Sequence, residues 1–152
     1  MQIAETVTFG GSGLDRAAQI RRDPVALDDA LARGLVLPLW RGKPLSDGSA
    51  LVWLPAGHPA LAEGLTPIFL GFDGDTPQFA TDISGWTLDP GSEPVVGGFS
   101  DPSVQIHPAI GDAAGFVELR GIMARLTPRE AELVATAKAL LSWHQSHRFC
   151  AA

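Results

Sequence analysis

The chain has 152 residues, of which 45% are hydrophobic and 18% charged, so it can bury one core and fold as one domain. Its formal net charge is −6 and its Lys and Arg residues are scattered, which argues against direct nucleic-acid binding. No segment resembles a signal peptide, no apolar run approaches the ~20 residues of a membrane span, and a single cysteine suits a reducing compartment, so we expect a cytoplasmic protein.

Two short helices are predicted over residues 14–33, with a break at Asp23-Pro24. Asp is a favourable N-cap, and Pro suits the first turn, where its missing N–H is not needed. Gly34 is expected to end the second helix.

Two apolar runs follow, Leu35 to Trp40 and Ala50 to Leu54, with a stretch rich in Gly, Pro and Asp between them. This pattern predicts a strand, a turn and a second strand. Pro38 lies within the first run and favours an edge position or a bulge, because proline cannot donate a hydrogen bond to a neighbouring strand.

A second hairpin is predicted from Ile68 to Phe72 and from Gln78 to Ile83, around the turn Asp73-Gly74-Asp75. We expect the two hairpins to be neighbours in one antiparallel sheet. Residues 84–115 are rich in Gly, Pro, Ser and Asp and have no sustained periodicity, which predicts a long connection.

The last third of the chain predicts a long helix over residues 128–147. Thr127, Pro128 and Glu130 have the spacing of a capping box with proline in the first turn. An apolar face then recurs at steps of three and four residues: Leu133, Val134, Ala137, Leu140, Leu141 and His144. A shorter helix is predicted within 116–126, and the fold class is α+β: a mostly antiparallel or mixed sheet of two hairpins flanked by helices.

Three acidic pairs are candidates for acid–base chemistry: Asp28 with Asp29, Asp73 with Asp75, and Glu130 with Glu132. Their positions favour structural roles. The first pair lies on an exposed helix, the second in a turn where Asp bonds to nearby backbone, and the third in a first helical turn, where carboxylates oppose the helix dipole.

One segment partly matches the Nudix signature, in which clustered glutamates hold the Mg²⁺ that polarises a pyrophosphate. Gly115 stands fourteen residues before Arg129-Glu130-Ala131-Glu132, as the signature requires. The metal-binding positions do not match, because they are occupied by Gly121, Leu133 and Val134. Apolar side chains cannot bind a hard cation, so no catalytic or cofactor-binding residue is predicted here.

The chain ends in "SWHQSHRFCAA", where His144, His147 and Cys150 are residue types that bind zinc. Three ligands without a fourth make a poor structural site. The alternative is that both histidines pack at the end of a helix, where a positive charge is favourable.

The stretches "VLPLWRGKPL", "PIFLGFDGDTPQFATDIS" and "FVELRGIMARLTPREAELVATAKALLSWHQSHRFC" resemble the amino-terminal part of NADH pyrophosphatases, Nudix hydrolases that split NAD(H) into nicotinamide mononucleotide and AMP. In that family a similar Trp-His and His-Arg-Phe-Cys run opens a four-cysteine zinc ribbon, and the catalytic domain follows. The resemblance implies that Cys150 is the first zinc ligand and that the sequence is a fragment whose next cysteine would be residue 153.

The resemblance further implies a rudimentary Nudix-like domain at 1–125, a linking helix at 126–147 and the start of a truncated zinc ribbon at 148–152. No cofactor is expected in the fragment, whereas zinc and magnesium or manganese are implied for the full-length parent. A homodimer that acts on NAD(H), with no membrane contact, is also implied.

Three functions compete at this point. The first is a non-catalytic accessory domain that supports dimerisation or frames the active site of the full-length enzyme. The second is a self-contained binding module whose tryptophans line a ligand or partner surface; Trp53 and Trp143 are expected in the core, and Trp86 is the candidate for that surface. A free-standing hydrolase is the weakest, since no metal or nucleophile constellation is found.

Overall fold

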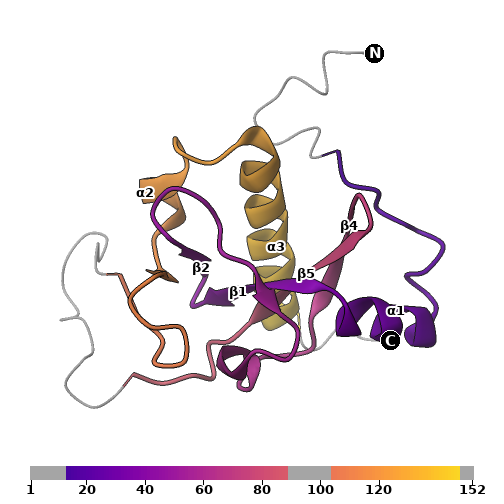
Figure 1. Ribbon diagram of the computed structural model, residues 1–152, viewed down its shortest axis with the longest axis horizontal. Coiled ribbons are helices and arrows are strands. Elements are labelled where there is room, and N and C mark those ends of the chain that lie inside the picture. The colour runs from indigo at the N-terminus through magenta and orange to yellow at the C-terminus, as the bar shows by residue number, and fades with distance from the viewer. Residues whose placement is uncertain (1–12, 89–103, 148–152) are drawn as a thin grey trace.

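The computed structural model describes residues 13–88 and 104–147, which form a mixed sheet with helices packed around it (Figure 1). In chain order the elements are α1 (Pro24–Ala32), β1 (Leu35–Trp40), β2 (Lys43–Ser46), β3 (Leu54–Pro55), a 3-10 turn (Pro59–Leu61), β4 (Ile68–Asp73), β5 (Thr76–Asp82), β6 (Gly115–Phe116), α2 (Leu119–Ile122) and α3 (Pro128–Ser146). The predicted α+β class and the long C-terminal helix are confirmed. None of the helices in the described ranges is long and apolar enough to cross a bilayer.

The strands follow the order β4-β5-β1-β2-β6, and β3 pairs with β1 beside β2. The hairpin of β4 and β5 is confirmed, as is a hairpin that starts from β1. The latter turns earlier than expected, at Arg41-Gly42, so β2 pairs with β1 and the run 50–54 supplies only the short β3. Two hairpins are neighbours, but β1 and β5 run parallel, so an entirely antiparallel sheet was wrong.

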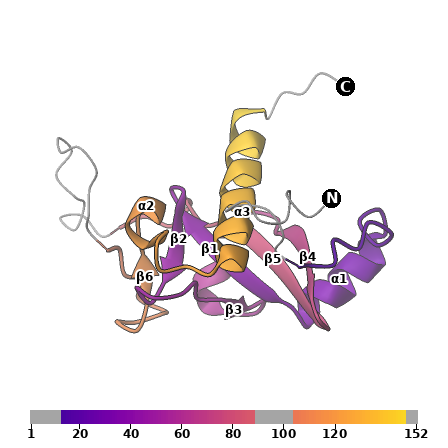
Figure 2. The same ribbon diagram turned by 90° about the horizontal axis from the view of Figure 1, so that it is seen from above.

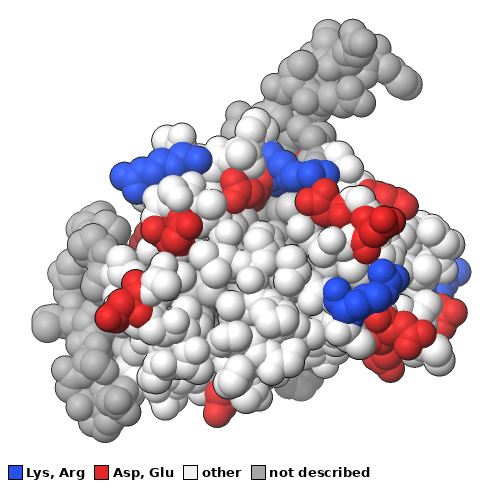
Figure 3. Space-filling view, viewed as in Figure 1, with Lys and Arg blue, Asp and Glu red and all other residues white. Residues whose placement is uncertain are grey.

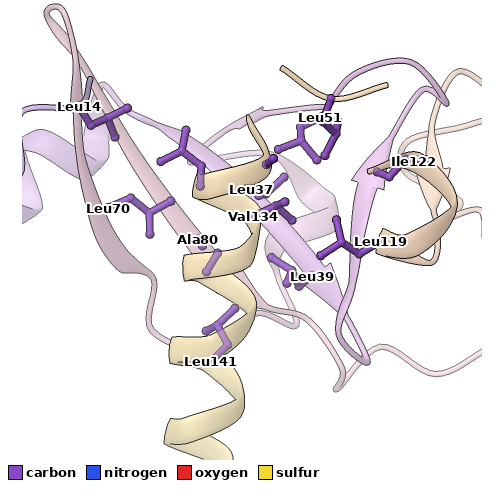
Figure 4. Packing of buried hydrophobic residues seen from close by; sticks show 14 residues of the cluster. Leu14, Leu37, Leu39, Leu51, Leu70, Ala80, Leu119, Ile122, Val134 and Leu141 are labelled. Atoms are coloured by element: carbon purple, nitrogen blue, oxygen red, sulfur yellow. The ribbon is translucent and has the colours of Figure 1, made fainter. Parts of the chain in front are cut away.

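Strand β1 is the centre of the fold because both of its faces are buried. Leu37 and Leu39 pack with α3, while Val36 and Trp40 belong to two clusters on the opposite face. Figure 4 shows Leu37 and Leu39 facing Val134 of the helix. A continuous apolar strand, rather than an alternating one, is typical of such a double burial.

The edge position predicted for Pro38 was wrong, since β1 has partners on both sides. On one side β3 pairs with Leu35 and Val36, and β2 pairs with Leu39 and Trp40, which leaves Pro38 between the two partner strands. The carbonyl of Leu39 accepts from Ile83 on the β5 side. Backbone groups of successive residues point to opposite sides, so the nitrogen of Pro38 faces the gap, where no donor is required.

Helix α3 begins at the predicted capping box. The Glu130 amide donates to Thr127 Oγ1 at 3.2 Å, and the Thr127 amide donates to Glu130 Oε2 at 3.0 Å. The helix crosses the sheet with its first turns, and its C-terminal end projects away from it (Figure 2). Asp23 caps α1, as predicted, by accepting from the amides of Val25 and Ala26. Helix α2 covers only Leu119–Ile122 of the predicted segment 116–126, because Phe116 belongs to β6 and the chain turns after Ile122.

The first of the two helices predicted within 14–33 was wrong, because the chain before Asp23 lies along β4. Asp15 exchanges two backbone hydrogen bonds with Phe72, at 3.1 and 2.7 Å. The guanidinium of Arg21 donates to the carbonyls of Phe69 and Leu70 at 2.8 and 3.0 Å. The backbone groups of the edge strand β4 therefore serve as hydrogen-bond partners for this segment, in place of partners within a helix.

The predicted long connection is described only in part. Residues 89–103 lie outside the described residues, while Gln105 pairs with Phe116 and extends the sheet edge at β6. The connection therefore returns the chain to the sheet just before α2.

Gly71 is required where the amino-terminal segment crosses β4. Its φ is +153°, and an added Cβ would lie 2.6 Å from the carbonyl oxygen of Asp15. We expect Gly71→Ala to lower the free energy of unfolding by about 1–3 kcal/mol. Gly57→Ala is the matched control, because its Cβ would meet no atom within 4 Å. Equal urea midpoints for the two variants would contradict this account.

Candidate functional site

The segment that partly matches the Nudix signature runs from β6 through α2 into the first turns of α3. Two of its metal positions, Leu133 and Val134, are 2% and 0% exposed and pack in the cluster of Leu37 and Leu39. The third, Gly121, lies in α2, where an added Cβ would meet no atom within 4 Å. The helix face that would hold a metal is therefore part of the core.

Glu130 has the residue type of a metal ligand but both of its oxygens are occupied. Oε2 accepts from the amide and hydroxyl of Thr127, at 3.0 and 2.9 Å. Oε1 accepts from the amide of Leu51 at 3.0 Å. The carboxylate thus caps α3 and fixes the loop before β3 to the start of the helix.

Glu132 is 9% exposed, and its carboxylate forms an ion pair with a distant residue. Its Oε1 lies 2.7 Å from Arg16 Nη2, and Arg16 also donates to the carbonyl of Leu70 at 3.2 Å. The other oxygen, Oε2, is buried without a hydrogen-bond partner among the described residues. Sequence reasoning missed this pair, because a separation of 116 residues leaves no local signal.

The remaining acidic candidates are dispersed. Asp73 accepts from Arg129 Nη1 at 2.8 Å, Asp75 lies in the exposed turn between β4 and β5, and Asp28 and Asp29 are exposed on α1. Within residues 13–88 and 104–147, no group of three or more His, Cys, Asp or Glu side chains is placed to hold a metal ion. The structural roles expected for the three acidic pairs agree with these positions.

The end of α3 carries an exposed aromatic group. Trp143 is 48% exposed, so its expected core position was wrong. Its ring stacks on His147 with centroids 4.9 Å apart, and His144 meets it edge-on at 5.3 Å. The cause is the projection of α3 beyond the sheet, which leaves this side of the last turns uncovered. Cys150 lies outside the described residues, so its role as a zinc ligand stays a prediction.

A groove of about 620 Å³ lies between the end of α3 and the chain that enters β4. Leu65, Ile68 and Leu141 make it largely apolar, and Gln145 at its rim donates to the buried carboxylate of Asp82. Leu140 and Trp143 are also exposed near the end of α3, but they are not part of the groove lining.

Trp86, the tryptophan expected to line a surface, packs in an aromatic cluster. Its ring centroid is 5.4 Å from Trp40, 6.1 Å from Phe116 and 4.6 Å from His107, and its carbonyl accepts from Trp40 Nε1 at 2.9 Å. Trp53 is half-buried against the α3 core, as expected. Trp86 therefore holds the 84–88 segment onto the sheet, and burial in this cluster lowers the pKa of His107.

A comparison with protein families identifies the family to which this arrangement of sheet and helices belongs. The family model for the NADH pyrophosphatase-like rudimentary NUDIX domain matches residues 33–143, which include the whole sheet and most of α3. The chain belongs to this family. A human mitochondrial NAD(P)H pyrophosphatase is 51% identical over 35 residues, which are 23% of this chain and 10% of that protein. The matched stretch thus spans about a tenth of the length of that relative.

Removal of the Glu130 carboxylate tests its structural role in this rudimentary NUDIX domain. Glu130→Ala leaves the amides of Thr127 and Leu51 without their acceptor, so we expect the free energy of unfolding to fall by about 1–3 kcal/mol. Chemical denaturation measures this difference. Asp28→Ala removes an exposed carboxylate from α1 and should change stability by less than about 0.5 kcal/mol. A similar loss in both variants would refute the role of Glu130.

The buried imidazole of His107 predicts a stability that depends on pH. Desolvation lowers its pKa below the ordinary 6.5, the charge of His58 lowers it further, and Glu63 partly offsets both. The unfolded chain therefore binds the proton more readily, and stability present above pH 6.5 is lost as pH falls through the interval between the unfolded and folded pKa values.

His107→Asn should flatten that acid-side loss, because Asn does not titrate yet can still accept from the Ala109 amide, as His107 Nδ1 does at 3.1 Å. The measurement is the Tm of both proteins between pH 8 and pH 5. The variant replaces no other titratable side chain, so the comparison isolates His107 together with its interaction with the charge of His58. Parallel curves would show that His107 does not carry the effect.

Proposed function

We propose that this chain is the non-catalytic amino-terminal domain of a NAD(H) diphosphatase, whose full-length form hydrolyses NADH to NMNH and AMP. One observation carries the proposal: the positions where the Nudix signature needs metal-binding glutamates are Leu133 and Val134, at the centre of the core. Cleavage of a diphosphate in this superfamily needs a bound divalent cation to polarise it. The magnesium or manganese site therefore belongs to another part of the enzyme.

In this proposal residues 1–125 are the rudimentary Nudix-like domain and 126–147 are a helix that leads to a zinc ribbon, which starts within 148–152 and takes Cys150 as its first ligand. The projection of α3 away from the sheet supports the linking role of the helix. A cytoplasmic location is part of the proposal and differs from the mitochondrial location in the name of the human relative.

The accessory role is either to support a homodimer or to frame the active site of the full-length enzyme. Both need a surface that another folded unit can cover. The apolar groove at Leu65, Ile68 and Leu141 is such a surface, and Trp143 and Leu140 are further exposed apolar side chains on the same end of α3. The same exposed Trp143 favours the second candidate function, a self-contained module that binds a ligand or partner.

The test is to incubate the purified chain with NADH and Mg²⁺ or Mn²⁺ and to follow NMNH and AMP by chromatography. We expect no product above the protein-free background, because residues 13–88 and 104–147 place no cluster of carboxylates to bind the cation. A full-length NAD(H) diphosphatase is the positive control. Turnover by the chain comparable to that control would overturn the accessory role, and its solution mass would separate dimer support from active-site framing.

A further inference from the structure

Residues 104–111 lie along the β6 edge of the sheet, and their outer part is weakly attached. Gln105 exchanges two backbone hydrogen bonds with Phe116, at 3.1 and 2.8 Å. Val104 and Ile106, on either side of Gln105, are 52% and 44% exposed, so they bury little apolar surface. A segment with few buried apolar contacts at the edge of a sheet can open while the rest of the fold stays closed.

His107 is the buried side chain that attaches this segment to the aromatic cluster. It is 8% exposed, and its ring centroid lies 4.6 Å from that of Trp86. Its Nδ1 accepts from the amide of Ala109 at 3.1 Å, and its carbonyl accepts from the amides of Ile110 and Gly111 at 2.9 and 3.1 Å. A ring nitrogen that accepts a hydrogen bond carries no proton, so this turn requires the neutral imidazole.

We propose that residues 104–111 are an acid-released segment: protonation of His107 detaches them from Trp86 and from β6, while the rest of the sheet and α3 stay folded. Protonation changes Nδ1 from an acceptor into a donor, which then faces the amide of Ala109. It also leaves a charge in a largely buried site, and opening lets water solvate that charge. This release is independent of the accessory role above and, unlike the loss of global stability, is confined to one segment.

Two charged neighbours act on the imidazole in opposite directions. Desolvation is the main cause of the lowered pKa of His107, the charge of His58 lowers this pKa further, and Glu63 raises it. His58 is held in place because its Nδ1 accepts from the amide of Ala60 at 3.1 Å at the start of the 3-10 turn. Glu63 is exposed, and its carboxylate lies beside Gly85. Both neighbours can therefore be replaced without a change to the segment itself.

The other elements around the imidazole contribute little charge. Residues 84–88 and β6 have no titratable side chain. Arg41 and Lys43 lie over the ring of Trp40, at 4.5 and 6.0 Å, and Asp112 is exposed. Figure 3 shows few Asp, Glu, Lys or Arg side chains on the side of the molecule where the 3-10 turn and the 104–111 segment lie. Burial and the two neighbours above are thus the main controls on protonation.

The test is amide hydrogen exchange of the full chain, followed by NMR and expressed as protection factors. The amides of Ile110 and Gly111 report release of the segment, and the amide of Val134 within α3 reports unfolding of the whole domain. We expect Ile110 and Gly111 to be less protected than Val134 and insensitive to low urea, because a local opening exposes little surface. Their protection should fall roughly tenfold between pH 7.5 and pH 5.0, within the limit of about thirtyfold that one proton allows below pH 6.5.

Four variants identify the groups that control the release. His107→Asn does not titrate but keeps an acceptor for the amide of Ala109, so the fall should disappear. His58→Asn keeps a cap for the 3-10 turn and removes the repelling charge, so the fall should be only a few-fold. Glu63→Gln removes the attracting charge, so the fall should approach about thirtyfold. Asp112→Asn removes an exposed carboxylate that does not act on His107 and should leave the fall unchanged.

Three results would overturn the proposal. Equal protection of Ile110, Gly111 and Val134 at every pH would mean that the segment opens only when the whole domain unfolds. An undiminished fall in His107→Asn, or shifts in the same direction for His58→Asn and Glu63→Gln, would mean that the imidazole does not control the release. The protection of Val134 checks that each variant is folded. The NADH assay is separate, because turnover of NADH would leave the acid release intact.

Discussion

The packing of α3 onto β1 is the constraint on which the rest of the structure depends. Leu133, Val134 and Ala137 of the helix share one cluster with Leu37 and Leu39 of the strand. These positions cannot also carry carboxylates, because a buried ionised group without a partner costs far more than the burial of an apolar side chain contributes. A helix in this register can fill a core or hold a divalent cation on this face, and here it fills the core.

The carboxylates on α3 connect the helix to segments that are distant in the sequence. Glu130 joins the helix start to the loop at Leu51, and Glu132 joins it to Arg16 of the segment along β4. The pair of Glu132 and Arg16 is partly exposed, with side-chain exposures of 12% and 41%, so its net contribution to stability is modest. Its effect is to fix where the amino-terminal segment lies, which hydrophobic contacts alone do not specify.

Two surfaces on different parts of the molecule offer different chemistry. The end of α3 and the entry to β4 are apolar and suit another folded surface, whereas a cavity beside α2 has a basic lining of Arg120, Arg125 and Lys138. The two surfaces share only α3, from which Lys138 faces the one and Leu141 the other.

The sequence by itself determined the elements whose signals are local: the capping box at Thr127 and Glu130, the cap of Asp23, the second hairpin and the apolar face of α3. Backbone hydrogen bonding and side-chain periodicity act within a few residues, so they can be read along the chain. Only the tertiary structure decided that β1 runs parallel to β5, that Pro38 faces a gap between two strands, and that residues before Asp23 follow β4 instead of forming a helix. The tertiary structure also decided the ion pair of Arg16 with Glu132, the basic lining of the cavity beside α2 and the exposure of Trp143. Each of these depends on which segments far apart in the sequence lie next to one another. Contacts between such distant segments leave no periodic pattern in the sequence.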